Sequence, residues 1–354
     1  MPIMADALRA CVTRIFQAAG LPDEDADAVA AHLVDSNLCG HDSHGVLRVD
    51  EYLNQLASGE LTAKPTIRIL SSGPAYLHLD AGCAFGQVVC GQLFDRLAGM
   101  AAQSGIACGS VCQAGHVGRL GAWVERVANQ GLCGLLSVND NGVCRVVAPP
   151  GGLAARISTN PLAIAVPTET QPLVLDLSTS AVANGKLKAA RMAGEKIPAG
   201  WVQDAAGGPS TDPAELLKSP PGSLLPFGGD QGYKAFGLGM VLDILISGLS
   251  GGFCPPAPAG AVEFNNLLAI VWDPDRFSGR DHIRREAERL MAFVRETPRK
   301  AGVDRIRLPG DRSAELRAER LQTGLVLDRS VCEMLAAHAQ RLNVPAPELQ
   351  QAAG

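Results

Sequence analysis

The feature that most constrains the fold is the pattern between residues 66 and 275, where short apolar runs alternate with helical segments and glycine separates them. Glycine accounts for 39 of the 354 residues, about 11% against a usual ~7%, and it permits tight turns and close backbone approaches. Apolar spacing assigns the segments to strands or helices. The predicted strands are 66–70, 75–80, 106–112, 132–138, 162–166, 173–177 and 266–272, and the predicted helices among them are 87–103, 120–129, 186–194 and 232–249.

Helical segments at both ends enclose this middle part. Ala5 to Ala19 carries apolar residues at helical spacing, and Pro22 to Leu38 begins with proline and acidic residues, which suit the first turn of a helix. Beyond residue 281 the pattern is helical again. Because segments of like character at the two ends of a chain can share one core, we expect them to pack together. The prediction is an α/β fold, with a helical domain from residues 1–72 plus 276–354 and an inserted central α/β domain at 73–275.

The composition indicates a folded protein and argues against several classes of partner. Charged residues make up 19% and hydrophobic residues 47%, which is typical of a globular protein and not of a disordered one. The formal net charge is only -5, and no dense stripe of lysine and arginine with interleaved aromatic residues is present. The sequence therefore gives no reason to expect a nucleic-acid partner.

The compartment is predicted from the cysteines and the apolar runs. The ten cysteines are scattered, without the paired short spacings of a zinc site, as expected for free thiols in a reducing compartment. The N-terminus lacks a basic segment followed by an apolar core, so no signal peptide is expected. The run from Val241 to Leu249 is interrupted by Asp243, and no run reaches the ~18 residues of a membrane span. We expect a cytoplasmic protein with no membrane partner.

One short segment combines several reactive side chains. If a helix begins near Ser43, then His44, Arg48 and Tyr52 lie four residues apart and form a stripe along one face, about 6 Å between neighbours. Arginine can bind a carboxylate through two parallel hydrogen bonds, and histidine has an ordinary pKa near neutrality. The stripe suits a small substrate with a carboxylate beside a group that gains or loses a proton. The alternative is an ordinary surface helix whose first turn is capped by Asp42 or Ser43.

Three further stretches could contribute to a site. His116 lies in Gly115-His116-Val117-Gly118, between a predicted strand and a helix, where backbone N–H groups can hold an anion. This is not the G-x-G-x-x-G fingerprint, so a Rossmann site is disfavoured. Asp176 ends an apolar strand and could accept a hydrogen bond from an imidazole or cap the next turn. The glycine-rich turn before Lys234 suits a pyrophosphate. His41 and His44 have metal-ligand spacing without a third ligand, so we expect no metal.

Taken together, these motifs resemble one known family along nearly the whole chain. The sequence is similar to the malate/L-lactate dehydrogenase family of the second type, also called the sulfolactate dehydrogenase-like oxidoreductases. This family includes malate, sulfolactate and ureidoglycolate dehydrogenases, diketogulonate reductase, and reductases of piperideine- and pyrroline-2-carboxylate. The motifs that carry the resemblance, in order, are Asp42-Ser43-His44-Gly45 with Arg48 and Tyr52, Gly115-His116-Val117-Gly118, Thr159-Asn160-Pro161-Leu162, Asp176-Leu177-Ser178, Gly228-Gly229 with Gly232-Tyr233-Lys234, and Leu308-Pro309-Gly310.

The resemblance implies a homodimer that binds NAD or NADP at a non-Rossmann site and acts on a small carboxylate substrate. It makes His44 a proposed proton donor and His116 the second active-site histidine, with Asp176 orienting a catalytic imidazole. Arg48 would bind the substrate carboxylate with help from Ser43 and Tyr52. The implied cofactor contacts are Thr159, Asn160, Pro172, Leu173, Val174, Leu175, Asp176, Leu177, Ser178, Tyr233, Lys234, Gly310, Asp311 and Arg312.

The expected reaction is reversible hydride transfer between the nicotinamide and C2 of a 2-oxo or 2-hydroxy acid, with His44 or His116 supplying the proton. The alternatives are reduction of a cyclic imino acid and, in a different class, a dimeric binding protein without catalysis. Some family members place a lysine that contacts the substrate just after the strand ending near Val138. This chain has Asn139-Asp140-Asn141 there, which weakens the malate hypothesis. The choice between NAD and NADP stays open.

Overall fold

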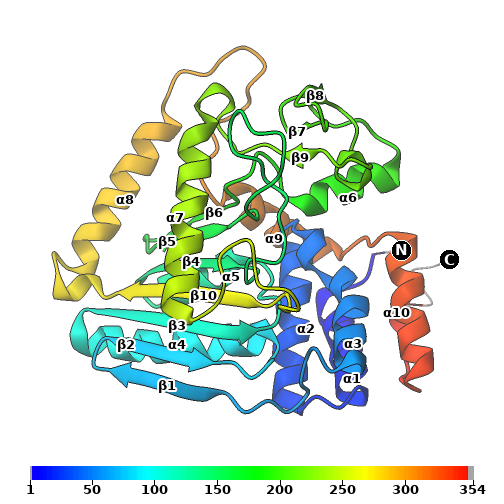
Figure 1. Cartoon of the computed structure of the whole chain (residues 1–354). Coiled ribbons are helices and arrows are strands. Elements are labelled where there is room, and N and C mark those ends of the chain that lie inside the picture. Colours follow the sequence, from blue (N-terminus) through cyan, green and yellow to red (C-terminus); the bar gives the residue numbers. More distant parts are fainter. Residues whose placement is uncertain (1, 350–354) are drawn as a thin grey trace.

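The computed structural model describes residues 2–349. Its two largest hydrophobic cores lie in a helical layer and around a central sheet, and Figure 1 shows the arrangement of these elements. The first of these cores is formed by helices. Helices from the start of the chain pack against helices from its end, and Leu8, Ile15, Leu33 and Leu335 are fully buried between them. This confirms that the two ends of the chain pack together. The helices involved are α1 (Ala5–Ala18), α2 (Asp23–Leu38), α3 (Val49–Ser58), α9 (Asp311–Thr323) and α10 (Arg329–Arg341).

The second core surrounds a seven-stranded sheet with the order β1-β2-β3-β10-β4-β5-β6. Only β2 and β3 pair in parallel, and every other pair is antiparallel. A Rossmann fold needs a parallel sheet, so this mixed sheet confirms the predicted non-Rossmann α/β class. The strands are β1 (Arg68–Gly73), β2 (Tyr76–Asp80), β3 (Ile106–Ala114), β4 (Cys133–Asn139), β5 (Leu162–Val166), β6 (Leu173–Leu177) and β10 (Asn265–Trp272).

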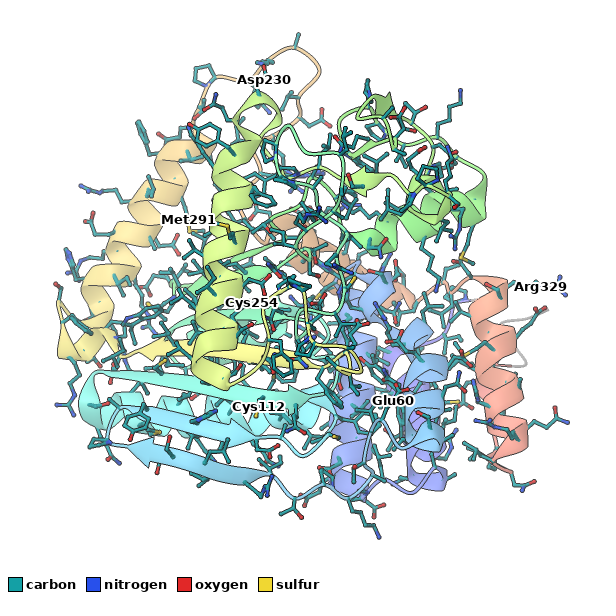
Figure 2. The ribbon with its side chains drawn as sticks, viewed as in Figure 1. Glu60, Cys112, Asp230, Cys254, Met291 and Arg329 are labelled. Atoms are coloured by element: carbon teal, nitrogen blue, oxygen red, sulfur yellow. The ribbon has the colours of Figure 1, made fainter. Side chains whose placement is uncertain are left out.

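Helices cover both faces of the sheet (Figure 1). Alternate residues of a strand point to opposite faces, and β10 shows this directly. Leu267, Ala269 and Val271 pack against α4 (Gly86–Ser104) and α5 (Leu120–Ala128), whereas Leu268 packs against α7 (Gly232–Ser250). Figure 2 shows side chains filling both layers. The remaining helices are α6 (Asn184–Ala193) and α8 (Arg280–Arg295).

One region differs from the sequence prediction. The segment 207–229, to which the sequence pattern assigns no strand or helix, contributes β8 (Pro209–Ser210) and β9 (Ser223–Leu224) to a small sheet with β7 (Val202–Gln203). The strands are only two residues long, too short for a periodic signal. At the predicted domain boundaries, β1 belongs to the large sheet, and α8 lies on the α7 side of the molecule in Figure 1. The division at residues 72 and 276 stays a prediction.

Helix α7 combines an apolar exterior with a polar anchor. Its length and mean hydropathy would allow a membrane span by composition, which the interrupted run in the sequence did not suggest. In the structure the helix packs on β10, β4 and β3. Asp243, buried on its inner face, accepts hydrogen bonds from Asn139 Nδ2 at 2.7 Å and Asn160 Nδ2 at 2.9 Å. These bonds fasten α7 to the last residue of β4 and to the segment that precedes β5.

Replacing Asp243 with alanine tests this anchor. The change would remove one of the acceptors of each of two buried amide groups, so the free energy of unfolding should fall by about 2–4 kcal/mol. Denaturant titration followed by circular dichroism measures it. The exposed Asp281, changed to alanine in parallel, should alter stability by less than about 0.5 kcal/mol. Equal midpoints for the two variants would show that the anchor is unimportant.

Candidate active site

The strand pairing brings several polar residues to one edge of the large sheet. β10 lies between β3 and β4, and its first residue, Asn265, pairs with Ala114 at the end of β3. Asn265 Oδ1 accepts a hydrogen bond from Val117 N at 3.0 Å, and its Nδ2 donates to Asn139 O at 3.1 Å. This asparagine therefore holds the loop that carries His116 against the end of β4.

The segment from Asp42 to Arg48 is not the continuous helix on which the predicted stripe of His44, Arg48 and Tyr52 depends. Two 3-10 turns, Asp42–His44 and Val46–Arg48, precede α3 and are separated by Gly45 in an extended conformation. Asn37 Oδ1 accepts a hydrogen bond from Val46 N at 2.8 Å, and a Cβ at residue 45 would lie 2.2 Å from that oxygen. The tight contact with Asn37 breaks the helix, so the predicted single stripe is wrong in its geometry.

Four of the predicted side chains nevertheless meet at the sheet edge. The rings of His44 and His116 stack with centroids 5.4 Å apart and planes 23° from parallel. Tyr52 Oη lies 2.8 Å from His116 Nδ1, and Ser43 Oγ lies 3.0 Å from His44 Nδ1. Neither Nε2 atom has a protein hydrogen bond within residues 2–349. Both imidazoles therefore use one nitrogen internally and keep the other for a ligand.

Arg48 borders the histidine pair and is already engaged by the protein. Its Nε donates to Ser43 O at 2.8 Å, and Nη1 forms an ion pair with Glu51 Oε2 at 2.5 Å. The Arg48 side chain is 27% exposed and that of Glu51 44%. The Ser43 carbonyl thus orients Arg48, and the carboxylate of Glu51 neutralises part of its charge. Because Glu51 is exposed, water can solvate its carboxylate if a substrate carboxylate takes its place.

Burial and positive charge keep both histidines neutral. Burial lowers the pKa of His44 to about 3, with Arg48 and His41 adding to the effect. Burial also lowers the pKa of His116 far below its usual range, and Arg48, His44 and His32 contribute. No carboxylate forms a hydrogen bond with either ring in the described part of the chain. A proton can enter this pair only when something negative binds beside it.

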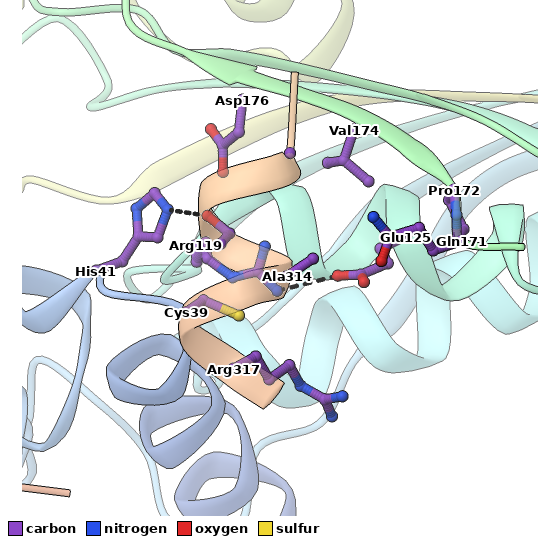
Figure 3. A pocket seen from close by; sticks show the side chains of 12 residues that line it. Cys39, His41, Arg119, Glu125, Gln171, Pro172, Val174, Asp176, Ala314 and Arg317 are labelled. Atoms are coloured by element: carbon purple, nitrogen blue, oxygen red, sulfur yellow. Dashed lines mark hydrogen bonds and ion pairs between the residues drawn. The ribbon is translucent and has the colours of Figure 1, made fainter. Parts of the chain in front are cut away.

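A separate cleft lies between the sheet and α9 (Figure 3). Four of the predicted cofactor residues line it, namely Pro172, Val174, Asp176 and Gly310. Leu173, Val174, Leu175, Asp176 and Leu177 form β6, which is an edge strand of the sheet.

Asp176, predicted to orient a catalytic imidazole, forms its side-chain hydrogen bond with the backbone of α5 instead of with His44 or His116. Asp176 Oδ2 accepts a hydrogen bond from Gly121 N at 2.8 Å, in the first turn of α5. Its negative charge acts on His41, which lines the same cleft and whose Nε2 lies 3.3 Å from Ser313 Oγ. The structure brings Asp176 to His41 and to a helix N-terminus, and an orienting contact with a catalytic imidazole stays a prediction.

The other predicted cofactor residues occupy several places. Asn160 is fully buried and donates to Gly239 O at 2.9 Å, while Thr159 O accepts from Thr179 N. Ser178 Oγ lies 3.0 Å from Ser180 Oγ. Tyr233 and Lys234 begin α7 and do not line the cleft. In α9, Asp311 accepts from Leu308 N, and Arg312 is exposed.

Sequence reasoning missed several residues that shape the site. Gln87 is 1% exposed and donates from Nε2 to Tyr52 Oη at 2.8 Å and to His116 O at 3.1 Å. His32 Nε2 accepts from Arg119 N at 3.0 Å, and its ring stacks on Trp123 with centroids 4.6 Å apart. A polar residue in an otherwise apolar stretch was the available signal for Gln87.

Asp140 follows β4 at the same sheet edge and is 7% exposed. Its Oδ1 has no hydrogen-bond partner among residues 2–349. The pKa of Asp140 is raised from 3.8 to about 6, chiefly by burial. A hydrogen bond from Ser158 lowers this pKa, whereas the negative charges of Glu263 and Asp243 raise it. Three carboxyl groups thus make this side of the edge unfavourable for another anion.

Asp140 should make stability depend on pH. Because its folded pKa is raised, the folded state binds the proton more tightly, and stability falls as pH rises from about 4 to about 6. Replacing Asp140 with asparagine should therefore raise the free energy of unfolding at pH 8 by up to about 3 kcal/mol and have little effect at pH 4. Denaturant unfolding at both pH values measures this, with Asp281→Asn as the control. An identical change at pH 4 and pH 8 would contradict it.

Comparison with known proteins places these features in context. The profile of the malate/L-lactate dehydrogenase family matches residues 3–336. The chain is 34% identical to an L-lactate dehydrogenase of Cupriavidus necator over 98% of this chain and 99% of that protein. It is 33% identical to a Δ1-pyrroline-2-carboxylate/Δ1-piperideine-2-carboxylate reductase of Pseudomonas syringae pv. tomato over 94% of each. The solved structure of malate dehydrogenase from Pyrococcus horikoshii superposes with a TM-score of 0.87 at 28% identity, covering 98% of this chain and 96% of that one.

Proposed function

The chain belongs to the malate/L-lactate dehydrogenase family, and on that premise we propose that it transfers a hydride between a nicotinamide cofactor and C2 of a small 2-oxo or 2-hydroxy acid. It is an oxidoreductase, as its relatives are. The observation that carries the proposal is the stacked pair His44 and His116 beside Arg48, in which neither Nε2 has a hydrogen-bond partner among residues 2–349. A carboxylate anchor and a proton carrier at one point are what reduction of a 2-oxo acid requires.

The cleft between β6 and α9 fits a nicotinamide cofactor, NAD or NADP. Gly310 (φ +88°) approaches the edge strand so closely that a Cβ there would lie 3.2 Å from Val174 O. Pro172, Val174 and Gly310 would hold the group along the strand edge. The glycine turn before Lys234 offers backbone N–H groups and a cation for phosphates. When bound, the cofactor supplies or accepts the hydride.

The residues of the chain have separable tasks in reduction of the oxo acid. Arg48 binds the substrate carboxylate in place of Glu51, which fixes the position of C2. The bound negative charge raises the depressed pKa of His44, so that this imidazole can take up a proton. His44 Nε2 then donates the proton to the carbonyl oxygen as C2 is reduced, and the carbonyl becomes a hydroxyl. In oxidation the neutral His44 removes the same proton.

A cyclic imino acid is the second candidate substrate. The relative from Pseudomonas syringae is named for reduction of pyrroline- and piperideine-2-carboxylate, and such a substrate offers the same carboxylate to Arg48. Asp140 and Glu263 at the sheet edge disfavour a second carboxylate, which argues against malate. A cyclic imine can arrive already protonated, and His44 would then not be needed as the proton donor.

Steady-state kinetics test the function directly. Oxidation of NADH and NADPH should be followed with pyruvate, oxaloacetate, a branched 2-oxo acid and piperideine-2-carboxylate. We expect turnover of a monocarboxylic substrate to exceed that of oxaloacetate. Arg48→Leu should raise KM at least tenfold, and His44→Ala should lower kcat about 100-fold while KM changes little.

The exposed Arg96 on α4 provides a matched control, since Arg96→Leu should leave both constants unchanged. Wild-type kinetics in the Arg48 and His44 variants would rule out this site. The cofactor that raises the melting temperature more is the preferred one; if neither does, and no substrate turns over, the enzymatic proposal fails.

We also propose a homodimer located in the cytoplasm. The outward face of α7 exposes a row of apolar side chains, including Val241 at 50%, Ile244 at 55% and Leu249 at 51% exposure. Water-exposed rows of this kind are typical of protein interfaces. The cytoplasmic proposal is supported by the ten cysteines, which are all free thiols.

A charge on this face should break the dimer. Ile244→Glu would place a carboxylate in the centre of the contact, where its desolvation is costly. Light scattering on a sizing column should show about half the wild-type mass. Leu290 on α8, 61% exposed, serves as the control, and Leu290→Glu should stay dimeric. A monomeric wild type, or a dimeric Ile244 variant, would exclude α7 as the interface.

A further inference from the structure

The structure contains a buried chain of hydrogen bonds that ends on one of the two histidines. Gln87, in the first turn of α4, donates from Nε2 to Tyr52 Oη at 2.8 Å, and Tyr52 Oη lies 2.8 Å from His116 Nδ1. Tyr52 and Gln87 are each 1% exposed. The mechanism above uses neither of them in contact with substrate, and the buried Tyr52 hydroxyl is already occupied by these two partners.

The orientation of the Gln87 amide can be deduced from its second partner. The same Nε2 lies 3.1 Å from the carbonyl oxygen of His116. A carbonyl oxygen only accepts hydrogen bonds, so the atom facing it must be the amide nitrogen. The amide therefore also donates to Tyr52 Oη, and this hydroxyl must send its own proton elsewhere.

His116 Nδ1 is the acceptor that remains for that proton. Burial raises the pKa of Tyr52 well above its usual value, which keeps the phenol protonated. With Tyr52 donating to Nδ1, a neutral His116 carries its proton on Nε2, the nitrogen without a protein partner. An imidazolium would need a second proton on Nδ1, and the phenol proton would then lose its acceptor inside the core.

We propose that Tyr52 and Gln87 are positioning residues that hold His116 neutral with its proton on Nε2, so that His116 donates a hydrogen bond to the reacting oxygen while His44 carries the proton. This assignment rests on the proposed function. His116 stabilises the developing negative charge without changing its own protonation state. Only the proton of His44 moves to the oxygen, so the oxo acid gains one hydride at C2 and one proton at its oxygen.

The surroundings of His116 agree with this division of roles. The charged or titratable groups that face it are Arg48 before α3, His44 in the first 3-10 turn, and His32 on α2. All three disfavour a positive charge on the ring. His44 differs because its Nδ1 meets the Ser43 hydroxyl at 3.0 Å, which can rotate and accept as well as donate. Protonation of His44 therefore leaves no buried donor unpaired.

The test is nitrogen NMR of the full-length protein labelled with 15N histidine, without added substrate. The chain has seven histidines, and the His116 signals are identified by their loss in His116→Gln. The wild type should show His116 as the Nε2–H tautomer from pH 5.5 to 8. In Tyr52→Phe the Phe16 and Phe85 rings can still pack on residue 52, but the hydroxyl is gone. His116 should then show both tautomers or a shift in its titration.

The kinetic readout is the split between kcat and KM. Tyr52→Phe and Gln87→Leu should each lower kcat about tenfold or more, with KM within about threefold, and should change the pH profile of kcat. Tyr76→Phe, which removes a hydroxyl from the exposed surface of β2, is the matched control and should change none of these.

A wild-type His116 that is an imidazolium at pH 6, or that carries its proton on Nδ1, would overturn the proposal. Unchanged tautomers in Tyr52→Phe would do so as well. The tautomer is measured without substrate or turnover. These results can therefore be obtained even if the proposed dehydrogenase function proves wrong. If Tyr52→Phe does not fold, the wild-type spectrum and Gln87→Leu still decide the question.

Discussion

The hydrogen bond between Tyr52 and His116 joins the two hydrophobic cores of the molecule. Tyr52 belongs to α3 of the helical layer, where its ring packs against Phe16 and Phe85, and His116 follows β3 of the sheet. The position of each element therefore depends on the other. A change that shifts the helical layer relative to the sheet would move the phenol away from the imidazole. The packing between the helical layer and the sheet therefore also fixes the geometry of the site.

The site is electrostatically unusual for proton transfer because its histidines have no carboxylate partner among the described residues. Burial, Arg48 and the neighbouring imidazole all favour the neutral form, so neither ring of the free protein is an imidazolium at neutral pH. The missing negative charge must come from the substrate. Under the proposed function this links protonation to binding, because the carboxylate that Arg48 binds is also the group that raises the pKa of His44. A ligand without a carboxylate would leave both imidazoles neutral.

The sequence predicted most elements of the fold because their signals are local. The strands 162–166 and 173–177 match β5 and β6 to the residue, and the two helices predicted at the start of the chain match α1 and α2 to within one residue at each end. Long-range contacts explain the errors. The break at Gly45 depends on Asn37, eight residues earlier, and the role of Gln87 depends on residues from α3 and the β3 loop. Neither contact leaves a periodic pattern in the sequence.

The candidate site was predicted less evenly, for the same reason. His44, Arg48 and His116 do lie close together, although not on one helix, because the two 3-10 turns before α3 and the loop after β3 meet at the sheet edge. Asp176 shows the opposite case, since the end of an apolar strand gave its location but not its partner. The strand order decides that partner: β6 is the edge strand beside α5, whereas His116 follows β3, separated from β6 by β10, β4 and β5.

Under the proposed function, Glu51 and the substrate carboxylate compete for Arg48, and this competition favours substrates with one carboxylate over substrates with two. In the free protein Glu51 neutralises part of its charge, and because Glu51 is 44% exposed, water can solvate it once it is displaced. Exchange of one carboxylate for another then costs little, so a monocarboxylate can bind without a large net gain or loss of charge. A dicarboxylate would bring a second charge toward Asp140 and Glu263, where burial has already raised the pKa of both carboxyl groups. The same electrostatics that make Arg48 available to one carboxylate therefore oppose a second.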